Sequence, residues 1–305
     1  MSELRSLIAG ELAQPVDPRV SAFAASIAAQ YGAASRAVLF YGSCLRSTEL
    51  DGQMLDFYLI VSRYEAAYGK SWLVGANKRL PPNVFPAEHD GLIAKVAVLS
   101  KDDFHRLNRI GASAVSVWAR FAQPSRLVWH ADQAAQAQVV DAIAGAPVTL
   151  FDMTIPMMGI DTEYSIMDLW KRGFELTYGA ELRAERTDRS GSVVDSDPER
   201  YERFGPAVVA AIGERDVVQD GKLRILASRT AVEKRWRQLR RNGKLLTLAR
   251  LAKASATYAG GIDYLAWKIN RHAGTDYVIR PWQRRWPILG ALVMLPRLIM
   301  GGAIK

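Results

Sequence analysis

Short apolar runs separated by polar breaks dominate the first half of the chain, in a pattern typical of a sheet with covering helices. Four runs of five to nine residues are too short for most helices and predict strands. These strands are Arg36–Phe40, Met54–Val61, Leu92–Ser100 and Ser125–His130. The Ala-rich segment Arg19–Tyr31 has helical spacing and is followed by Gly32, a common C-terminal stop.

The segments between these strands predict further helices. They are a turn with a short helix at Gly42–Thr48, a helix and a mobile loop within Tyr64–Pro86, and helices at Lys101–Ile110, Ala112–Ala122 and Ala131–Ala144. Helices flanking one small mixed sheet predict an α/β (α+β) domain. Gly145 and Pro147 interrupt the last helix, so we place the end of this first domain at residue 147.

The second region, residues 148–277, is predicted to be mainly helical. Its helices are expected at Asp161–Leu182, Glu199–Ile212 and Thr230–Ala256, with an exposed polar loop at Arg183–Pro198. Apolar residues recur there at spacings of three and four, as on one face of a helix. The last of these helices is strongly basic, with the run KRWRQLRRNGK.

The C-terminal tail, residues 278–305, reads VIRPWQRRWPILGALVMLPRLIMGGAIK. Its apolar run, Ile288–Met300, is shorter than the about 20 residues that a spanning helix needs. Trp282 and Trp286 precede that run among arginines, which favours an amphipathic helix lying in a bilayer interface. The alternative is a terminal helix docked on the protein's own core.

Charge is unevenly distributed along the 305 residues. From Lys222 to Lys305 there are 18 Lys and Arg against 3 Asp and Glu, whereas the rest of the chain has 22 against 28. Such a basic segment indicates an anionic surface as partner, either nucleic acid or anionic lipid. The N-terminus lacks an apolar signal segment, so a secretory signal peptide is not expected.

One cysteine, Cys44, excludes an internal disulfide framework. It directly follows Gly42 and Ser43, but no histidine is near it in sequence. We therefore interpret Cys44 as a small residue packed at a turn rather than as a nucleophile.

Candidate chemistry lies in Val38–Val61, which reads VLFYGSCLRSTELDGQMLDFYLIV. A Gly-Ser turn after a strand lets backbone N–H groups approach a phosphate. Asp56 lies inside an apolar strand, where a carboxylate needs a partner such as a metal ion or a hydrogen-bond donor. Gly42-Ser43 followed by a strand Asp is the core pattern of nucleotidyltransferases, although Tyr58 stands where that superfamily usually has a second carboxylate.

Lys95, inside the third predicted strand, has two interpretations. A strand lysine commonly extends to a sheet edge. At a phosphate site it would instead contact the triphosphate of a nucleotide.

Four blocks in order resemble the mitochondrial-type CDP-diacylglycerol synthases, which are peripheral CTP:phosphatidate cytidylyltransferases of the translocator assembly and maintenance family. They are Tyr41-Gly42-Ser43 with Met54-Leu55-Asp56-Phe57, the segment Gly91–Ser100 around Lys95, Ala119–Pro124 around Arg120, and Leu176–Arg183. This family also lacks the second superfamily carboxylate. The blocks cover roughly Ala37–Arg183, and the rest matches only in helical, basic character and a membrane-associating end.

The resemblance implies a nucleotidyltransferase-like first domain that makes CDP-diacylglycerol and pyrophosphate from CTP and phosphatidic acid with Mg²⁺. Gly42 and Ser43 would hold the triphosphate, and Lys95 and Arg120 would neutralise phosphates. Asp56 would bind Mg²⁺, with Asp51 or Asp90 as a second carboxylate.

For the second domain, the resemblance implies that Tyr178, Glu181 and Arg183 shape the interface with the first domain, with Arg183 facing the substrate phosphate. An interdomain salt bridge is the alternative role for these residues. We expect a protein bound to the cytoplasmic face of a bacterial inner membrane, or to an organellar inner membrane, with no nucleic acid as partner.

Two other classes of function remain open at this point. One is a soluble nucleotidyltransferase that acts on RNA or a small molecule. The other is a catalytically inactive adaptor on the membrane. The sequence does not indicate an oligomeric state.

Overall fold

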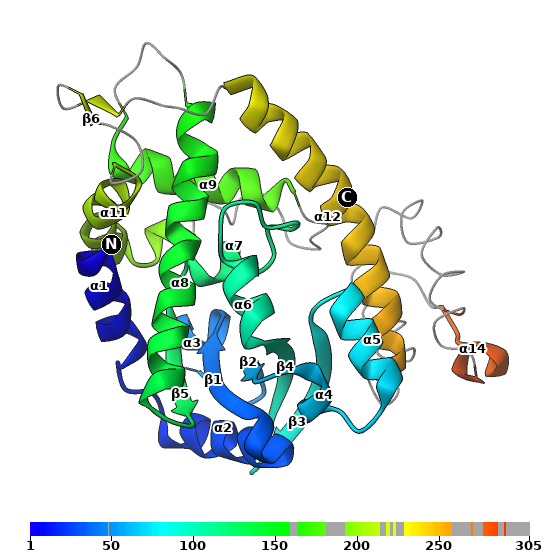
Figure 1. The fold of residues 1–305 in the computed structure, drawn as a ribbon. Helices are drawn as coiled ribbons and strands as arrows, with labels where there is room; N and C mark the ends of the chain where they lie inside the picture. Colours follow the sequence, from blue (N-terminus) through cyan, green and yellow to red (C-terminus); the bar gives the residue numbers. More distant parts are fainter. Residues whose placement is uncertain are drawn as a thin grey trace.

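Five strands form one mixed sheet in the order β3-β4-β2-β1-β5 (Figure 1). The computed structural model describes residues 1–47, 49–158, 164–180, 193–213, 218–219, 222–223, 229–257, 270, 277–285 and 290. Strands β2 and β4 are parallel, and the other neighbours in the sheet are antiparallel. The strands are β1 Ser35–Tyr41, β2 Met54–Val61, β3 Asn83–His89, β4 Leu92–Ser100 and β5 Ser125–His130.

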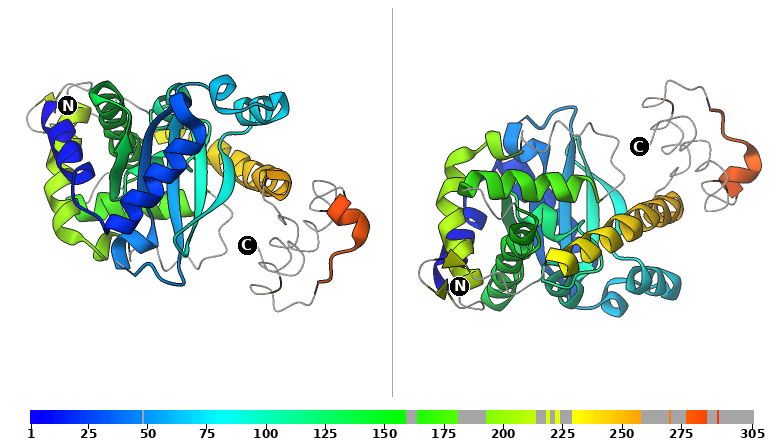
Figure 2. Two further views of the ribbon diagram at one scale, coloured as in Figure 1. Left: turned by 90° about the horizontal axis from the view of Figure 1, so that it is seen from below. Right: turned by 90° about the horizontal axis from the view of Figure 1, so that it is seen from above.

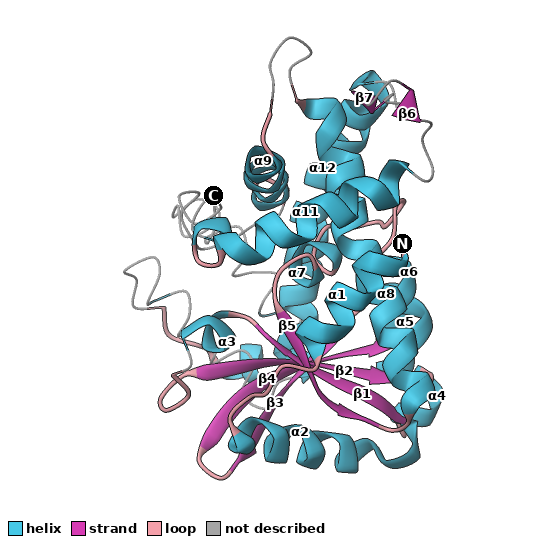
Figure 3. Cartoon of the chain, turned by 90° about the vertical axis from the view of Figure 1, so that its left-hand side faces the viewer, coloured by secondary structure: helices cyan, strands magenta, loops and turns pink. Residues whose placement is uncertain are grey.

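Helices cover both faces of this sheet (Figure 3). Helix α2 (Pro18–Tyr31) lies on one face, and α6 (Lys101–Leu107), α7 (Trp118–Phe121) and α8 (Gln133–Thr154) lie on the other. Around α8 pack α1 (Ser2–Leu12), α9 (Ile166–Tyr178) and α11 (Pro198–Gly213). The remaining elements are α3 Ser43–Ser47, α4 Tyr64–Ala67, α5 Ser71–Arg79, α12 Arg229–Thr257, α14 Pro281–Arg285, the 3₁₀ turns Gly32–Ala34 and Ile155–Met157, and the short strands β6 Val218–Gln219 and β7 Lys222–Leu223.

The predicted mixed α/β class is confirmed, and so are the four predicted strands. Strand β3 was missed, because the predicted loop before Pro86 hid it. Pro86 is tolerated there since β3 is an edge strand with one hydrogen-bonded neighbour. Asp90 and Gly91, both with positive φ, form the tight hairpin turn into β4, and this Asp-Gly pair was the available sequence signal.

The helices of the structure differ from the predicted ones in three places. Helix α1 was not predicted, and only Trp118–Phe121 of the expected helix Ala112–Ala122 is α-helical. Helix α8 continues through Pro147 to Thr154, so the predicted domain limit at residue 147 falls inside a helix. The division into domains at residues 147 and 277 stays a prediction.

Helix α8 is the central helix of the layer that covers the sheet face opposite α2. With the turn after it, Gln133–Met157, it is the one helix among the described residues that is long and apolar enough to cross a membrane. However, 78% of its apolar window is buried inside the protein. Burial against α1, α6, α9 and α11 accounts for its apolar character.

Alternating side chains divide the protein interior into two cores. Phe57 and Leu59 of β2 face α2, whereas Tyr58 and Ile60 face α8. This period of two follows from the pleat of a strand. On the α8 side, the core continues into the second half of the chain through Trp170, Tyr201 and Trp236.

A buried ion pair joins the N-terminal helix to the second half of the chain. The Arg200 guanidinium of α11 binds both carboxylate oxygens of Glu11 in α1, at 3.0 Å for Nη2–Oε1, and each side chain is 5% exposed. Arg200 also donates to the Ala122 carbonyl at 3.2 Å and stacks on the Phe204 ring. Burial opposes the charge on Arg200, but Glu11 offsets this and the pKa of the guanidinium is raised.

We expect Arg200→Met to lower the free energy of unfolding by about 3–5 kcal/mol, because Glu11 would stay buried without a partner. The double variant Glu11→Leu/Arg200→Met should recover most of this loss. Urea unfolding measures both. Arg5→Met is the matched control, since its ion pair with Asp141 is about half exposed and should be worth at most about 1 kcal/mol. Equal losses in Arg200→Met and Arg5→Met would contradict the prediction.

Candidate functional site

Polar side chains line up across the sheet at one end of its α8 face. Lys95 of β4 is the register partner of Asp56 in β2, Asp56 is the partner of Tyr41 in β1, and Tyr41 is the partner of Ser125 in β5. Neighbouring strands lie about 4.8 Å apart, so partners on one face are in reach of each other. We call Lys95, Asp56, Tyr41 and Ser125 the transverse row.

Strand alternation places the whole row on the α8 side. Tyr58 and Ile60, which share the parity of Asp56, belong to the core under α8, and Ala97 and Leu99 do the same for Lys95. Asp56 and Lys95 are each half-buried. The row thus occupies the end of the face where the apolar core stops.

Gly42 leaves room for the Asp56 carboxylate directly after β1. It has a φ of +96°, and a Cβ at this position would lie 3.0 Å from Oδ2 of Asp56. A positive φ favours glycine, and a Cβ here would require the Asp56 carboxylate to shift. Ser43, the next residue, is exposed at the start of α3.

Arg120 of α7 reaches the row from above the sheet. Burial raises the pKa of Tyr41 well above its usual range, and the Asp56 charge raises it further. The charge and hydrogen bond of Arg120 act in the opposite direction. Arg120 also donates to the backbone carbonyl of Ser116. The structure therefore brings together Gly42, Asp56, Lys95 and Arg120, four residues that the sequence singled out.

Tyr58 lies at the position where the nucleotidyltransferase pattern usually has a second carboxylate. It is 2% exposed and its ring lies 5.2 Å from both the Tyr41 ring and the Phe121 ring of α7. An aromatic side chain at this position fixes α7 on the sheet, and α7 carries Arg120. Tyr58 thus helps to position α7 and its Arg120 over the sheet.

Three other residues discussed from the sequence, Asp51, Asp90 and Cys44, are not part of the row. Asp51 is 81% exposed, and its carboxylate accepts from Arg19 of α2 at 2.9 Å. Asp90 is equally exposed, beside His89 in the β3–β4 hairpin. Cys44 is buried, and its thiol donates to the Met54 carbonyl at 3.6 Å, in agreement with a packing role.

Tyr178 lies at the end of α9, where it packs partly buried against the upper core. Glu181 and Arg183 lie outside the described residues. Their predicted roles stay predictions.

The residues at the row fit a magnesium ion bound together with nucleotide phosphates. No group of three or more His, Cys, Asp and Glu side chains gathers within the described ranges. Magnesium in nucleotide sites commonly takes one or two carboxylates and completes its shell with phosphate oxygens and water. Asp56, beside the space that Gly42 leaves open, supplies one such carboxylate.

Sequence reasoning missed a second cationic group, on α12. Arg250 donates from Nε to the Pro81 carbonyl at 3.0 Å and from Nη1 to the Ser116 hydroxyl at 3.0 Å. Lys253 donates to the Pro82 carbonyl at 2.7 Å and to the Leu80 carbonyl. In sequence these two residues look like ordinary members of a basic helix, so no local signal could have found them.

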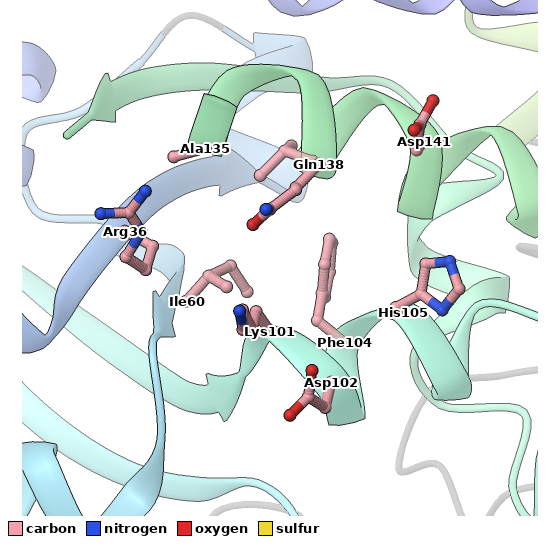
Figure 4. A pocket seen from close by; sticks show the side chains of 10 residues that line it. Arg36, Ile60, Lys101, Asp102, Phe104, His105, Ala135, Gln138 and Asp141 are labelled. Atoms are coloured by element: carbon pink, nitrogen blue, oxygen red, sulfur yellow. The ribbon is translucent and has the colours of Figure 1, made fainter. Parts of the chain in front are cut away.

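A separate cavity of about 210 Å³ lies at the opposite end of the same sheet face (Figure 4). It is lined by Ile60, four residues along β2 from Asp56, and by residues of α6 and α8. Its Arg36 is bound to Asp132 at 2.7 Å, and its Asp141 is bound to Arg5 at 3.0 Å. Two of its charges are therefore already paired, and Lys101, Asp102 and His105 complete its charged lining.

Comparisons with known proteins give no further assignment. No protein-family model matches the chain, and a search of curated proteins finds no significant match.

Gly42→Ala should weaken nucleotide binding far more than Gly52→Ala. Both glycines have positive φ, so both variants carry backbone strain of about 1–2 kcal/mol. A Cβ at Gly52 meets open space, whereas one at Gly42 meets Asp56. Thermal unfolding with and without Mg²⁺ and CTP measures both effects. Equal ligand-induced stabilisation in the two variants would show that the contact with Asp56 is irrelevant.

Lys253 should make stability depend on pH. Burial, followed by the charge of Arg250, lowers its pKa from 10.5 to about 7. Between these values the unfolded chain binds the extra proton, so stability should rise with pH, by on the order of 1 kcal/mol per pH unit. Lys253→Met removes this dependence, and its stability relative to the wild type should therefore fall between pH 7 and pH 9.

Urea unfolding at several pH values checks this prediction. Lys234→Met, at an exposed position of the same helix, controls for the loss of a lysine. Parallel pH profiles for wild type and Lys253→Met would contradict it.

Proposed function

We propose that the protein is a Mg²⁺-dependent CTP:phosphatidate cytidylyltransferase that forms CDP-diacylglycerol and pyrophosphate. The observation that carries this proposal is the transverse row. It sets Asp56 between Lys95 and Tyr41, next to a glycine turn and below Arg120. A carboxylate with two cations and an open backbone turn suits a nucleoside triphosphate and its metal ion.

The reaction needs positioning and charge neutralisation more than acid–base chemistry. The acceptor phosphate is already an anion, so it can attack the α-phosphorus of CTP without a strong general base. Bringing two anions together is the main barrier, and fixed cations lower it. Lys95 and Arg120 supply these cations, and Gly42 and Ser43 bind the triphosphate by backbone N–H and hydroxyl groups.

Asp56 holds Mg²⁺ in this proposal, with the remaining ligands from phosphate oxygens and water. When bound, the ion neutralises phosphate charge and orients the triphosphate. Tyr41, which is partly buried and hydrogen-bonded to Arg120, keeps Asp56 and Arg120 in place. Tyr41 itself stays protonated, because its raised pKa excludes a role as base near neutral pH.

A membrane location suits the second substrate. The exposed residues of α12 include several cations that face away from the core, such as Lys234, Arg237 and Arg241. Basic residues near an anionic leaflet contribute about 1 kcal/mol each. The C-terminal tail, of which α14 with the exposed Trp282 is described, is proposed to add an interfacial anchor on the inner face of the membrane.

Formation of CDP-diacylglycerol from CTP and phosphatidate in mixed micelles tests the proposal. Asp56→Asn should lower the rate by about 10²–10⁴-fold, as expected when a fixed electrostatic group is lost. Asp102→Asn, at an exposed carboxylate near the other end of the sheet, should leave the rate unchanged. Asp51→Asn shows whether the Asp51 carboxylate also serves the metal.

The other outcomes separate the alternatives. Wild-type protein that binds Mg²⁺–CTP but makes no lipid product would indicate another acceptor, such as RNA or a small molecule. Protein that binds no CTP would favour an inactive adaptor. Equal activity of Asp56→Asn and wild type would refute the role of Asp56.

A further inference from the structure

Helix α12 brings two cations, Arg250 and Lys253, to the loop that precedes β3. It lies along the β3 edge of the sheet, although more than 130 residues separate it from β3 in sequence (Figures 1 and 2). Two side chains fix it there, since Arg250 and Lys253 bind three consecutive backbone carbonyls, those of Leu80, Pro81 and Pro82.

Ser116 connects these cations to the row. Its carbonyl accepts from Arg120, and its hydroxyl accepts from Arg250. Two guanidinium groups therefore meet on one buried residue. One of them, Arg120, interacts with Tyr41 of the row. The other, Arg250, lies close enough to Lys253 for its charge to lower the pKa of that lysine.

The protonated form of Lys253 is destabilised in the folded protein. Its hydrogen-bond partners are neutral carbonyls, and the charged group that affects its pKa is Arg250, another cation. Within the described residues no carboxylate offsets this burial. A partly buried cation beside a like charge is unfavourable for folding, and such groups concentrate at functional sites where an anion completes them.

We propose that Arg250 and Lys253, with Arg120, form the subsite that binds the phosphate monoester of the acceptor. The inference rests on the proposed function and names which part of the protein holds the second substrate. A phosphate monoester has a charge of about −1.5 to −2 at neutral pH and three acceptor oxygens, which suits an arginine and a lysine together. CTP would be held separately by Gly42, Ser43 and Asp56.

Steady-state kinetics with dioctanoyl phosphatidate distinguishes the two phosphate sites. Lys253→Met and Arg250→Gln should each raise the KM for phosphatidate about tenfold to hundredfold, as when a charge-assisted hydrogen bond is lost. The KM for CTP should change less than about twofold. Equal changes in both constants, or none in the KM for phosphatidate, would overturn the proposal.

Arg235→Gln is the matched control. Arg235 lies on the same helix and also donates to backbone carbonyls, but among the described residues its hydrogen bonds go to Gly111, Ala112 and Gln238. It should leave both KM values unchanged. A loss of phosphatidate binding in Arg235→Gln as large as in Lys253→Met would show that α12 acts only through its packing.

Calorimetric titration without CTP tests the subsite independently of turnover. Wild-type protein at pH 8 should bind dioctanoyl phosphatidate with uptake of close to one proton, because the phosphate recharges Lys253. Lys253→Met should show weaker binding and no uptake. Glycerol 3-phosphate as ligand separates recognition of the phosphate alone from recognition of a lipid headgroup.

Each titration outcome decides something about the subsite. Binding of both ligands, weakened together in Lys253→Met, supports a phosphate monoester site. Binding of phosphatidate alone with proton uptake supports a site that also needs the lipid chains. Absence of binding, or binding unchanged in Lys253→Met, overturns the proposal even if the wild type makes CDP-diacylglycerol. Binding without turnover would leave the subsite standing and refute the reaction.

Discussion

The register between β1, β2 and β4 is the constraint on which the site depends. Side chains alternate with a period of two, so a slip of one residue in β2 would move Asp56 to the α2 face and Phe57 into the row. The apolar residues that follow Asp56 on both faces are buried, which makes such a slip very costly. The two cores therefore fix the register, and the register places Lys95, Asp56 and Tyr41 side by side at the end where burial stops.

Much of this part of the protein could be predicted from sequence. The strands at Met54–Val61 and Leu92–Ser100 agree with the structure because local apolar runs of that length have few alternatives. Gly42 and Asp56 stood out for chemical reasons, and the structure places them next to each other. Strand β3 was missed because Pro86 and Glu88 break its apolar pattern, and an edge strand needs only one neighbour. Pro147 was taken as a break, but tertiary packing keeps α8 helical across it.

The positions of the α12 cations could not be predicted from the sequence, for a different reason. Its basic composition indicated an anionic partner but could not distinguish residues that face solvent from Arg250 and Lys253, which point to the β3 edge. That distinction depends on the loop at Pro81 and on Ser116, both far away in sequence. Long-range placement of this kind is set by the shared core, here by Trp236, whose indole N–H donates to the Met153 carbonyl at 2.8 Å. A single helix can thus present some of its cations to solvent and others to the β3 edge of the sheet.

The ion pair of Glu11 and Arg200 also limits the order in which contacts of the fold can form during synthesis. Helix α1 precedes α11 in the chain, so its buried carboxylate has no guanidinium to bind until α11 has been synthesised. At about 5–20 residues per second, the 189 residues between them take on the order of 10–40 s. During this interval the apolar side of α1 has no α11 to cover it. The nascent chain therefore passes through a period in which α1 is available to chaperones, although all strands of the central sheet have already been synthesised.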